Sequence, residues 1–283
     1  MKLQPGTVYL VGAGPGDPGL LTVKASKLLK AADVVCYDSL VGDEIIEAIP
    51  ADTECINVGK RPGPEGKRTT QTDINRLLVD YATANHKVVR LKGGDPTIFG
   101  RGGEEAVYLA RHHIPHEIVP GVTSAIAGPN CHGIPLTHRE IASSLTIITG
   151  HEAREKDESA LDWAAISNIL RTGGTLVVLM GVQSLPTIVK KLREEEISSD
   201  LPAAMIERAT LPGETIIVDT LDTIVAAAQE SDISPPAVTV FGEVVSMHFS
   251  VAYRNEPSAI ARVATAVSHN QAIITNVLEE GEY

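Results

Sequence analysis

The chain has 283 residues, of which 43% are hydrophobic and 21% are charged, and this composition is typical of a globular protein large enough for two domains. Its formal net charge of −12 falls almost entirely on residues 121–283, so no basic face is apparent and nucleic acid is disfavoured as a partner. No apolar run is long enough to cross a bilayer, which predicts that the protein does not associate with a membrane.

The first residues and the cysteines indicate the compartment. Met1-Lys2 leads almost directly into a predicted strand, without the apolar segment of a signal peptide. Cys36, Cys55 and Cys131 are isolated and odd in number, so we expect buried free thiols rather than disulfides. Both features predict a cytoplasmic protein.

A glycine-rich loop follows the first predicted strand, residues 7–11, and precedes a predicted helix. This layout, with Asp38 after the second strand, is also that of a dinucleotide-binding turn. The GxGxxG spacing, however, would require glycine at the position of Asp17, and Pro15 and Pro18 lack the backbone N–H donors that would bind pyrophosphate. The loop therefore favours a ligand without phosphates, and a nucleotide-binding reductase or regulator stays open as the alternative from another class.

Strands and helices alternate in the first half of the chain, which predicts a parallel sheet, whereas closely spaced strands late in the second half predict a mixed sheet there. The break at Pro120-Gly121 divides an N-terminal α/β domain, 1–120, from a C-terminal α/β domain, 121–250, and the tail 251–283 lies outside both. Predicted strands lie at 7–11, 34–37, 54–58, 88–91, 117–119, 144–149, 175–180, 203–207, 215–219 and 237–241. Predicted helices lie at 21–32, 43–49, 70–81, 101–111, 162–170, 185–195, 221–229 and 259–267, and another begins after Val122.

The stretch from Val88 to Glu105 is the most informative part of the sequence. A β-rich run ends at Gly93-Gly94, where the backbone can adopt positive φ or approach a ligand closely. Asp95-Pro96 follows, and a helix then begins near Arg101 with two carboxylates in its first turn, where the helix dipole favours negative charge. A buried strand, a glycine turn, a polar tip and a helix together place functional groups at the carboxyl end of a strand in α/β proteins.

Several short motifs occur in a fixed order along residues 7–245. They are Gly12–Gly19 (GAGPGDPG), Tyr37-Asp38, Val58–Arg61 (VGKR), Leu91–Pro96 (LKGGDP), Phe99–Glu104 (FGRGGE), Pro120–Ser124 (PGVTS), Gly133–Arg139 (GIPLTHR) and Met180-Gly181. Taken together, this ordered set resembles the tetrapyrrole methylases.

The resemblance implies a tetrapyrrole methylase fold: two α/β domains, a mainly parallel N-terminal sheet and a mixed C-terminal sheet, with the active site in the cleft between domains of a homodimer. It also implies S-adenosyl-L-methionine as the methyl donor, S-adenosyl-L-homocysteine as a product, and no metal. The implied reaction is C-methylation of uroporphyrinogen III at carbons two and seven, which gives precorrin-2 for the sirohaem and cobalamin branches. The glycine and proline loops are consistent with this donor, because a sulfonium carries a positive charge and no phosphate.

The motif match also implies roles for individual residues. Asp38 and Lys60 fall on the positions of the proton acceptor and donor, and Arg101 competes with Asp38 as the group that handles the proton. The implied cofactor contacts are Pro15, Gly93, Gly94, Asp95, Ile98, Thr123, Ser124, Met180, Ala209 and Ala237. The implied substrate contacts are Arg61, Glu104 and Arg139, and arginine forks suit the eight carboxylates of the macrocycle.

Simpler interpretations stay open beside these roles. Asp38 could cap the next helix, Lys60-Arg61 could form a solvated turn, and Met180 could belong to the core. His138 is expected to be a hydrogen-bonded structural residue, and the nine histidines show no metal-ligand spacing. The nearest alternative activity is that of a sister enzyme, another precorrin C-methyltransferase that acts on a later precorrin at a different carbon.

Overall fold

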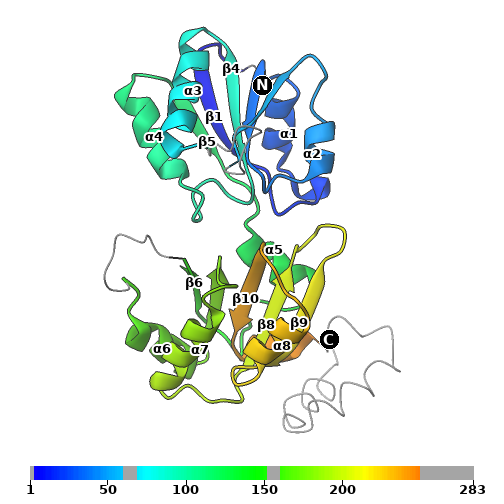
Figure 1. Ribbon diagram of the computed structural model, residues 1–283, viewed down its shortest axis with the longest axis vertical. Coiled ribbons are helices and arrows are strands. Elements are labelled where there is room, and N and C mark those ends of the chain that lie inside the picture. Colours follow the sequence, from blue (N-terminus) through cyan, green and yellow to red (C-terminus); the bar gives the residue numbers. More distant parts are fainter. Residues whose placement is uncertain (1–2, 60–68, 152–159, 249–283) are drawn as a thin grey trace. The chain divides into compact units, whose positions relative to one another are not determined.

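The computed structural model describes residues 3–59, 69–151 and 160–248 (Figure 1). The chain divides into two compact units, the first ending at Ser124 and the second beginning at Ala125, slightly after the break that the sequence predicts. The predicted helix at 259–267 and the tail 251–283 lie outside the described residues. Among the helices of the described ranges, none combines the length and apolar character that crossing a membrane requires.

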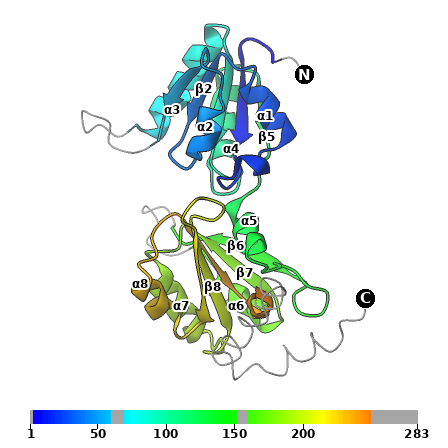
Figure 2. The same ribbon diagram turned by 90° about the vertical axis from the view of Figure 1, so that its right-hand side faces the viewer.

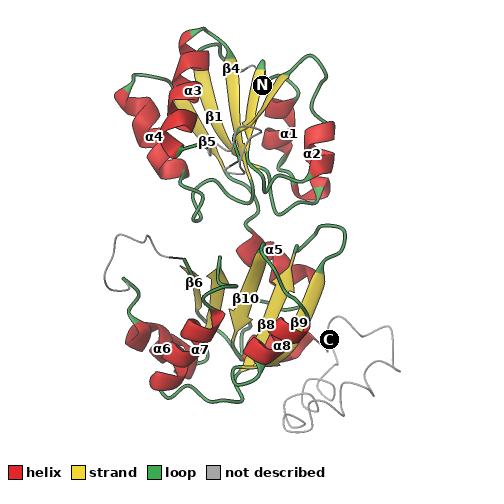
Figure 3. Cartoon of the chain, in the orientation of Figure 1, coloured by secondary structure: helices red, strands yellow, loops and turns green. Residues whose placement is uncertain are grey.

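The first unit alternates strands and helices (Figure 3). Its strands are β1 (Thr7–Gly12), β2 (Val34–Tyr37), β3 (Glu54–Asn57), β4 (Lys87–Lys92) and β5 (His116–Val119). The helices described in this unit are α1 (Val23–Leu29), α2 (Asp43–Glu47), α3 (Gln71–Thr83), α4 (Gly102–Arg111) and the short 3-10 helix η1 (Pro18–Leu20).

The five strands of the first unit form one sheet in the order β3-β2-β4-β1-β5, and every pair is parallel. The parallel sheet that the sequence predicts is therefore confirmed. Helices α1 and α2 lie on one face of the sheet, and α3 and α4 lie on the other (Figure 1). Neighbouring strands β1 and β4 thus lead to helices on opposite faces, which is the switch point where open α/β sheets bind ligands, beyond the carboxyl ends of the strands.

Side chains of the first sheet alternate between two buried layers. Tyr9 and Val11 of β1 face α1 and α2, whereas Val8 and Leu10 face α3 and α4. Each fully buried Val or Leu side chain of these layers stabilises the fold by about 1.5–3 kcal/mol. Strands buried on both faces are usually apolar throughout. The central strand β4 departs from this pattern, because Arg90 and Lys92 are charged and buried.

Helix α3 begins with a capping box formed by Thr70 and Asp73. The Thr70 hydroxyl accepts the backbone N–H of Asp73 at 3.2 Å, and the Asp73 carboxylate accepts the backbone N–H of Thr70 at 2.9 Å. Both donors belong to the group that a helix leaves unpaired at its N-terminus, so this pairing fixes where α3 starts. The helix then buries Ile74 and Leu78 against the sheet.

The second unit contains a second set of strands and helices. Its strands are β6 (Leu145–Thr149), β7 (Thr175–Leu179), β8 (Pro202–Glu207), β9 (Thr215–Thr220) and β10 (Ala237–Phe241). The helices described in this unit are α6 (Trp163–Arg171), α7 (Leu185–Glu194), α8 (Ile224–Glu230) and the short 3-10 helix η2 (Glu243–Ser246), together with α5 (Ser124–Cys131), whose first residue ends the first unit.

The sheet of the second unit has the order β6-β7-β10-β8-β9. Strands β6 and β7 are parallel, whereas the other pairs are antiparallel, so the predicted mixed sheet is confirmed. Helices α6, α7 and α8 cover one face through a core that includes Leu176 and Met205. Helix α5 and the segment 134–142 cover the opposite face, which includes Val177 and Ile206 (Figure 2).

The prediction that all three cysteines are buried is wrong for two of them. Cys36 is buried in β2, and this burial raises the pKa of its thiol to about 12. Cys55 is exposed because it lies on the edge strand β3, whose residues are largely solvent-facing. Cys131 is exposed at the last residue of α5.

Candidate active site

Three glycines pack backbone to backbone at the carboxyl ends of β1, β4 and β5. A Cβ atom added to Gly12 would lie 2.5 Å from the Cα of Gly121 and 2.6 Å from the carbonyl oxygen of Gly94. Real Cβ atoms essentially never come this close to backbone atoms. Only glycine therefore fits where the loops after these three strands meet.

The loops after β1 and β4 are joined by hydrogen bonds beyond the end of the sheet. The N–H of Gly94 donates to the carbonyl of Gly14 at 2.7 Å, and the N–H of Gly14 donates to the carbonyl of Gly94 at 3.1 Å. Both residues have positive φ, +77° at Gly14 and +68° at Gly94, which glycine adopts at little cost. A Cβ on Gly94 would be in ordinary van der Waals contact with the backbone of Thr123 and Ser124, at 3.9–4.0 Å. The first unit thus brings Gly94, Thr123 and Ser124 together, with Pro15 next to Gly14.

Asp95 ties the loop after β4 to the loop after β5. Its Oδ1 accepts the N–H of Thr97 at 2.8 Å, the hydroxyl of Thr97 at 2.6 Å and the N–H of Ile98 at 3.3 Å. Its Oδ2 accepts the N–H of Gly121 at 3.1 Å. Burial raises the pKa of Asp95, but the hydrogen bonds from Thr97, Gly121 and Ile98 outweigh burial and hold this pKa below its ordinary value. The predicted cofactor residue therefore also organises the site.

The substitution Asp95→Asn tests this structural role. At pH 7 we expect the free energy of unfolding to fall by about 1 kcal/mol, because the amide nitrogen in place of Oδ2 cannot accept the N–H of Gly121. The folded-state pKa of Asp95 is depressed, so its contribution is present above the unfolded pKa near ~4 and is lost as pH falls through the lower folded pKa. Urea unfolding at several pH values should show the difference from wild type shrinking in acid.

A matched control for this measurement is Asp162→Asn at the start of α6 in the second unit. The Oδ1 of Asp162 accepts the N–H of Ala165 at 2.9 Å, and asparagine offers the same oxygen and is an equally good N-cap. The control should be nearly neutral at every pH. A difference for Asp95→Asn that stayed constant down to strongly acidic pH would contradict the role assigned to the carboxylate.

The loop from Asp95 to α4 presents an apolar tip and then an arginine. Ile98 and Phe99 are 39% and 41% exposed. Phe99 and Arg101 both have positive φ, +53° and +60°, although neither is glycine. The turn is closed by a hydrogen bond from the N–H of Gly102 to the carbonyl of Pro96 at 2.8 Å. Such backbone strain persists only where the surroundings fix it, and it is concentrated at functional sites.

Arg101 and Glu104, predicted to face the substrate, form a two-point ion pair. The Nε of Arg101 lies 3.0 Å from Oε1 of Glu104, and an Nη lies 2.6 Å from Oε2. The hydrogen bonds to Glu104 raise the pKa of the Arg101 guanidinium above its usual value. A guanidinium has N–H donors but no acceptor, which favours Asp38 over Arg101 as the acceptor of a proton.

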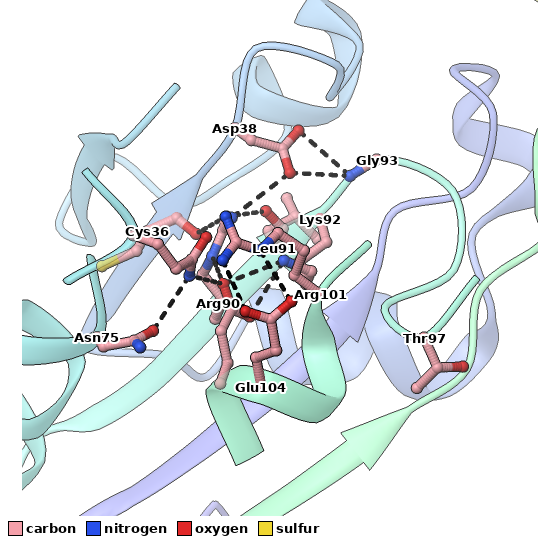
Figure 4. A network of polar contacts seen from close by, with 12 residues as sticks. Cys36, Asp38, Asn75, Arg90, Leu91, Lys92, Gly93, Thr97, Arg101 and Glu104 are labelled. Atoms are coloured by element: carbon pink, nitrogen blue, oxygen red, sulfur yellow. Dashed lines mark hydrogen bonds and ion pairs between the residues drawn. The ribbon is translucent and has the colours of Figure 1, made fainter. Parts of the chain in front are cut away.

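Asp38 follows β2 and lies 22% exposed beside Gly93. Its Oδ1 accepts the N–H of Leu40 at 3.0 Å. The N–H of Gly93 is shared between Oδ1 at 3.3 Å and Oδ2 at 3.4 Å, and Oδ2 lies 3.6 Å from Arg90 (Figure 4). The interpretation that Asp38 caps the next helix is wrong, because the N-cap of α2 is Gly42. Instead, the carboxylate lies within hydrogen-bonding distance of the glycine turn after β4.

A buried ion cluster lies beneath Asp38, and the sequence reasoning missed it. Glu105 of α4 is fully buried, and its carboxylate lies 3.3 Å from the Nε of Arg90 and 3.1 Å from the Nζ of Lys92. The amide of Gln71 donates to Glu105 at 3.1 Å. Burial lowers the pKa of Lys92, the charge of Arg90 lowers it further, and Glu105 partly offsets both effects. The available signal was the presence of two cations in a strand at the centre of a parallel sheet.

Three predicted cofactor residues of the second unit lie where strands β7 and β8 end and strand β10 begins. Met180 follows β7, Ala237 begins β10, and Ala209 lies just beyond β8. Strand β10 is antiparallel to both β7 and β8, with Val238 opposite Leu179, so it begins where they end. This arrangement places all three residues at the same end of the three strands.

The three side chains differ in their exposure to solvent. Met180 is 50% exposed and has a φ of +55°, so the interpretation of Met180 as a core residue is wrong. Ala209 is buried in the core beneath α5, where Gly128 packs against it. Ala237 is partly buried.

Arg139 lies exposed at the tip of a tight turn in the second unit. The turn is closed by His138 and Ala142, which exchange backbone hydrogen bonds of 3.0 and 2.9 Å. The ring of His138 accepts the N–H of Glu140 at 3.3 Å, so the prediction that His138 is hydrogen-bonded is confirmed.

Two predicted site residues, Lys60 and Arg61, lie outside the described residues. Across the described ranges, no three His, Cys, Asp or Glu side chains lie together in an arrangement that could hold a metal ion.

Comparison with known proteins identifies the family. The sequence profile of the Tetrapyrrole (Corrin/Porphyrin) Methylases matches residues 7–225. The chain is 49% identical to the S-adenosyl-L-methionine-dependent uroporphyrinogen III methyltransferase of Methanosarcina barkeri (strain Fusaro), over 86% of this chain and 93% of that protein. It is 46% identical to the uroporphyrinogen-III C-methyltransferase of Methanocaldococcus jannaschii, over 86% of this chain and 98% of that protein.

A solved structure shows the same fold. The uroporphyrin-III C-methyltransferase of Thermus thermophilus, complexed with S-adenyl homocysteine, matches with a TM-score of 0.71 and 42% identity, over 85% of this chain and 99% of that chain. The profile match covers well over half of the sequence, and the relatives are covered almost completely. The chain therefore belongs to the tetrapyrrole (corrin/porphyrin) methylases.

Proposed function

We propose that this chain catalyses the S-adenosyl-L-methionine-dependent C-methylation of uroporphyrinogen III at carbons two and seven, giving precorrin-2. The observation that carries the proposal lies at the carboxyl ends of β1, β4 and β5, where Gly12, Gly94 and Gly121 pack backbone to backbone and Gly94 faces the backbone of Thr123 and Ser124. The 49% identical relative from Methanosarcina barkeri bears the name of this activity and supports the proposal.

The site suits a sulfonium cofactor better than a dinucleotide. Gly93 and Gly94 let main-chain groups approach the methionine part closely, and the carboxylate of Asp95 balances its ammonium. Oδ2 of Asp95 accepts the N–H of Gly121 and, as a carboxylate oxygen, has room for a second donor. Pro15, Ile98, Thr123 and Ser124 complete the proposed contacts in the first unit, and the proposed contacts in the second unit are Met180, Ala209 and Ala237.

The chemistry needs positioning and one proton acceptor. An electron-rich pyrrole carbon attacks the methyl carbon, a C–C bond forms, the C–S bond breaks, and S-adenosyl-L-homocysteine leaves as a neutral thioether. Holding the two reactants in line supplies much of the rate. The methylated macrocycle then loses a proton, and we assign its acceptance to Asp38. Lys60 keeps the proton-donor position that the family resemblance implies and takes no part in this step.

The substrate carries eight carboxylates, whereas the whole chain is acidic. Substrate recognition therefore depends on cations placed locally rather than on a general positive field. We assign this role to Arg61, Arg101 and Arg139, with Glu104 orienting Arg101 through its two-point ion pair.

The test is anaerobic incubation of the purified chain with S-adenosyl-L-methionine and uroporphyrinogen III, followed by mass spectrometry. We expect a product that carries two added methyl groups, and NMR should place them on carbons two and seven. Unmodified macrocycle would contradict the proposal. Methylation of a later precorrin only would identify the sister activity, and calorimetric binding of NAD but not of S-adenosyl-L-homocysteine would identify a nucleotide-binding protein.

We also propose that the protein is a cytoplasmic homodimer. Light scattering of the purified protein should give twice the mass of one chain, which is 30.0 kDa. A monomeric mass under assay conditions would contradict this part of the proposal without affecting the assigned reaction.

Arg139→Ala provides a separate test of substrate recognition. Arg139 is exposed, so its loss should leave folding and cofactor affinity unchanged. Losing a charge-assisted contact to a carboxylate should raise KM for the macrocycle by about tenfold or more, and Arg139→Lys should recover only part of this loss. Steady-state kinetics and calorimetry with S-adenosyl-L-homocysteine measure the two effects. A lower affinity for S-adenosyl-L-homocysteine together with an unchanged KM for the macrocycle would contradict the assignment.

A further inference from the structure

We propose that Arg90 is a positioning residue that holds the Asp38 carboxylate in place, and that buried Glu105 in turn holds Arg90. The inference deepens the proposed function, because it rests on the assignment of Asp38 as the proton acceptor. Arg90, Lys92 and Glu105 do not themselves contact the reacting groups in this proposal.

The guanidinium of Arg90 is fixed from several sides. One terminal nitrogen donates to the carbonyl of Leu91 at 2.9 Å and to the carbonyl of Cys36 at 3.3 Å, so it spans the ends of β4 and β2. The Nε lies 3.3 Å from Glu105. The other terminal nitrogen lies 3.6 Å from Oδ2 of Asp38 (Figure 4). The Arg90 side chain is only 4% exposed, so these partners leave it little freedom to move.

Asp38 is thereby held on two sides. Its Oδ1 accepts the backbone N–H of Leu40, both of its oxygens share the backbone N–H of Gly93, and its Oδ2 also faces Arg90. A carboxylate that abstracts a proton must keep both its distance and its orientation to the substrate. Because Gly93 also belongs to the proposed cofactor loop, the same carboxylate links proton acceptance to the geometry of that loop.

Stability alone does not require this cluster. Replacing a buried ion network by apolar side chains of similar volume is often neutral or stabilising. The charges also match in number, since the cations Arg90 and Lys92 face the carboxylates Glu105 and Asp38. The four charges therefore sum to zero, and Asp38 is the member of the cluster that is most exposed to solvent. Such a cluster can hold the Asp38 carboxylate in a fixed orientation.

Arg90→Met is the first test, because it leaves Lys92 and Glu105 paired in the core. We expect kcat to fall on the order of tenfold or more, with calorimetric affinity for S-adenosyl-L-homocysteine and KM nearly unchanged. In an Asp38→Ala background the same substitution should have little further effect on kcat, because the group that Arg90 positions is gone. Arg76→Met is the matched control, since the pair that Arg76 forms with Asp80 on α3, 3.9 Å apart, is exposed.

A second variant guards against a simple folding defect. The triple variant R90M/K92M/E105L replaces the ion cluster by apolar side chains and should unfold at or above the wild-type temperature while showing the same loss of kcat. Full activity of this folded triple variant, or effects of Arg90→Met and Asp38→Ala that simply add, would overturn the proposal.

A crystallographic measurement separates this inference from the proposed function. In crystals of Arg90→Met we expect the Asp38 carboxylate to rotate away from the N–H of Gly93. An unmoved carboxylate would overturn the inference whatever the activity of the enzyme. Failure of the wild-type chain to methylate uroporphyrinogen III would refute the proposed function alone.

Discussion

Replacing Gly12 by alanine should eliminate measurable binding of S-adenosyl-L-homocysteine and destabilise the first unit. The added Cβ would lie 2.5 Å from the Cα of Gly121 and 2.6 Å from the carbonyl oxygen of Gly94. Neither neighbour can retreat easily, because β5 pairs with β1 and the Gly94 loop is bonded to Gly14. Overpacking of this kind costs about 1–3 kcal/mol, and the displaced loops are the proposed cofactor contacts. Calorimetric titration and urea unfolding measure the two effects.

Gly103→Ala is the matched control for this glycine substitution. A Cβ at Gly103, in the first turn of α4, meets nothing within 4 Å, and alanine favours a helix over glycine. The control should bind the cofactor normally and be as stable as wild type or slightly more stable. Normal cofactor affinity in Gly12→Ala would mean that the junction of the three loops is not the cofactor site.

Glu105→Gln should give the largest loss of stability of any conservative substitution proposed for the first unit. The change leaves Arg90 and Lys92 buried without their shared carboxylate. Removing one partner of a buried ion pair typically costs about 3–5 kcal/mol, because the remaining charge is uncompensated. The free energy of unfolding in urea at neutral pH measures the effect.

Asp80→Asn on α3 is the control for charge removal. Its pair with Arg76 is solvent-exposed, and such pairs contribute about 0–1 kcal/mol. An equally small loss for Glu105→Gln would show that the two cations find other partners or water. It would also remove the physical basis for a rigid Arg90.

The fold followed from the sequence because its signals were local and mutually consistent. The β-rich runs, the helical spacing of apolar residues and the capping box at Thr70 and Asp73 each specify an element without tertiary information. The alternation of strands and helices then predicts a parallel first sheet, and the closely spaced later strands predict a mixed second sheet. Both are observed. The exposure of Cys55 was not predictable in this way, because it depends on β3 lying at a sheet edge.

The candidate site was predictable only in part. Glycine turns and Asp-Pro mark the loops, and the family resemblance points to Asp38, Asp95 and Arg101. Sequence could not show that Asp95 is tied to Gly121, since the partner lies on a different strand connection. Nor could it show that Glu105 faces inward whereas Glu104, its neighbour in the same first turn, faces Arg101, because side-chain direction depends on where α4 packs. The roles assigned to the site residues remain predictions for the experiments above.

The buried ion cluster around Glu105 and the exposed charges of the site, such as Arg101, will respond differently to salt. Interactions between solvent-exposed charges are screened over a Debye length of about 8 Å at physiological ionic strength, whereas buried pairs are screened much less. The side chain of Glu105 is fully buried, while that of Arg101 is 43% exposed. Raising the ionic strength should therefore weaken attraction of the polyanionic macrocycle while leaving the alignment of Asp38 intact. A salt titration of the kinetics separates capture of the substrate from the chemistry that follows it.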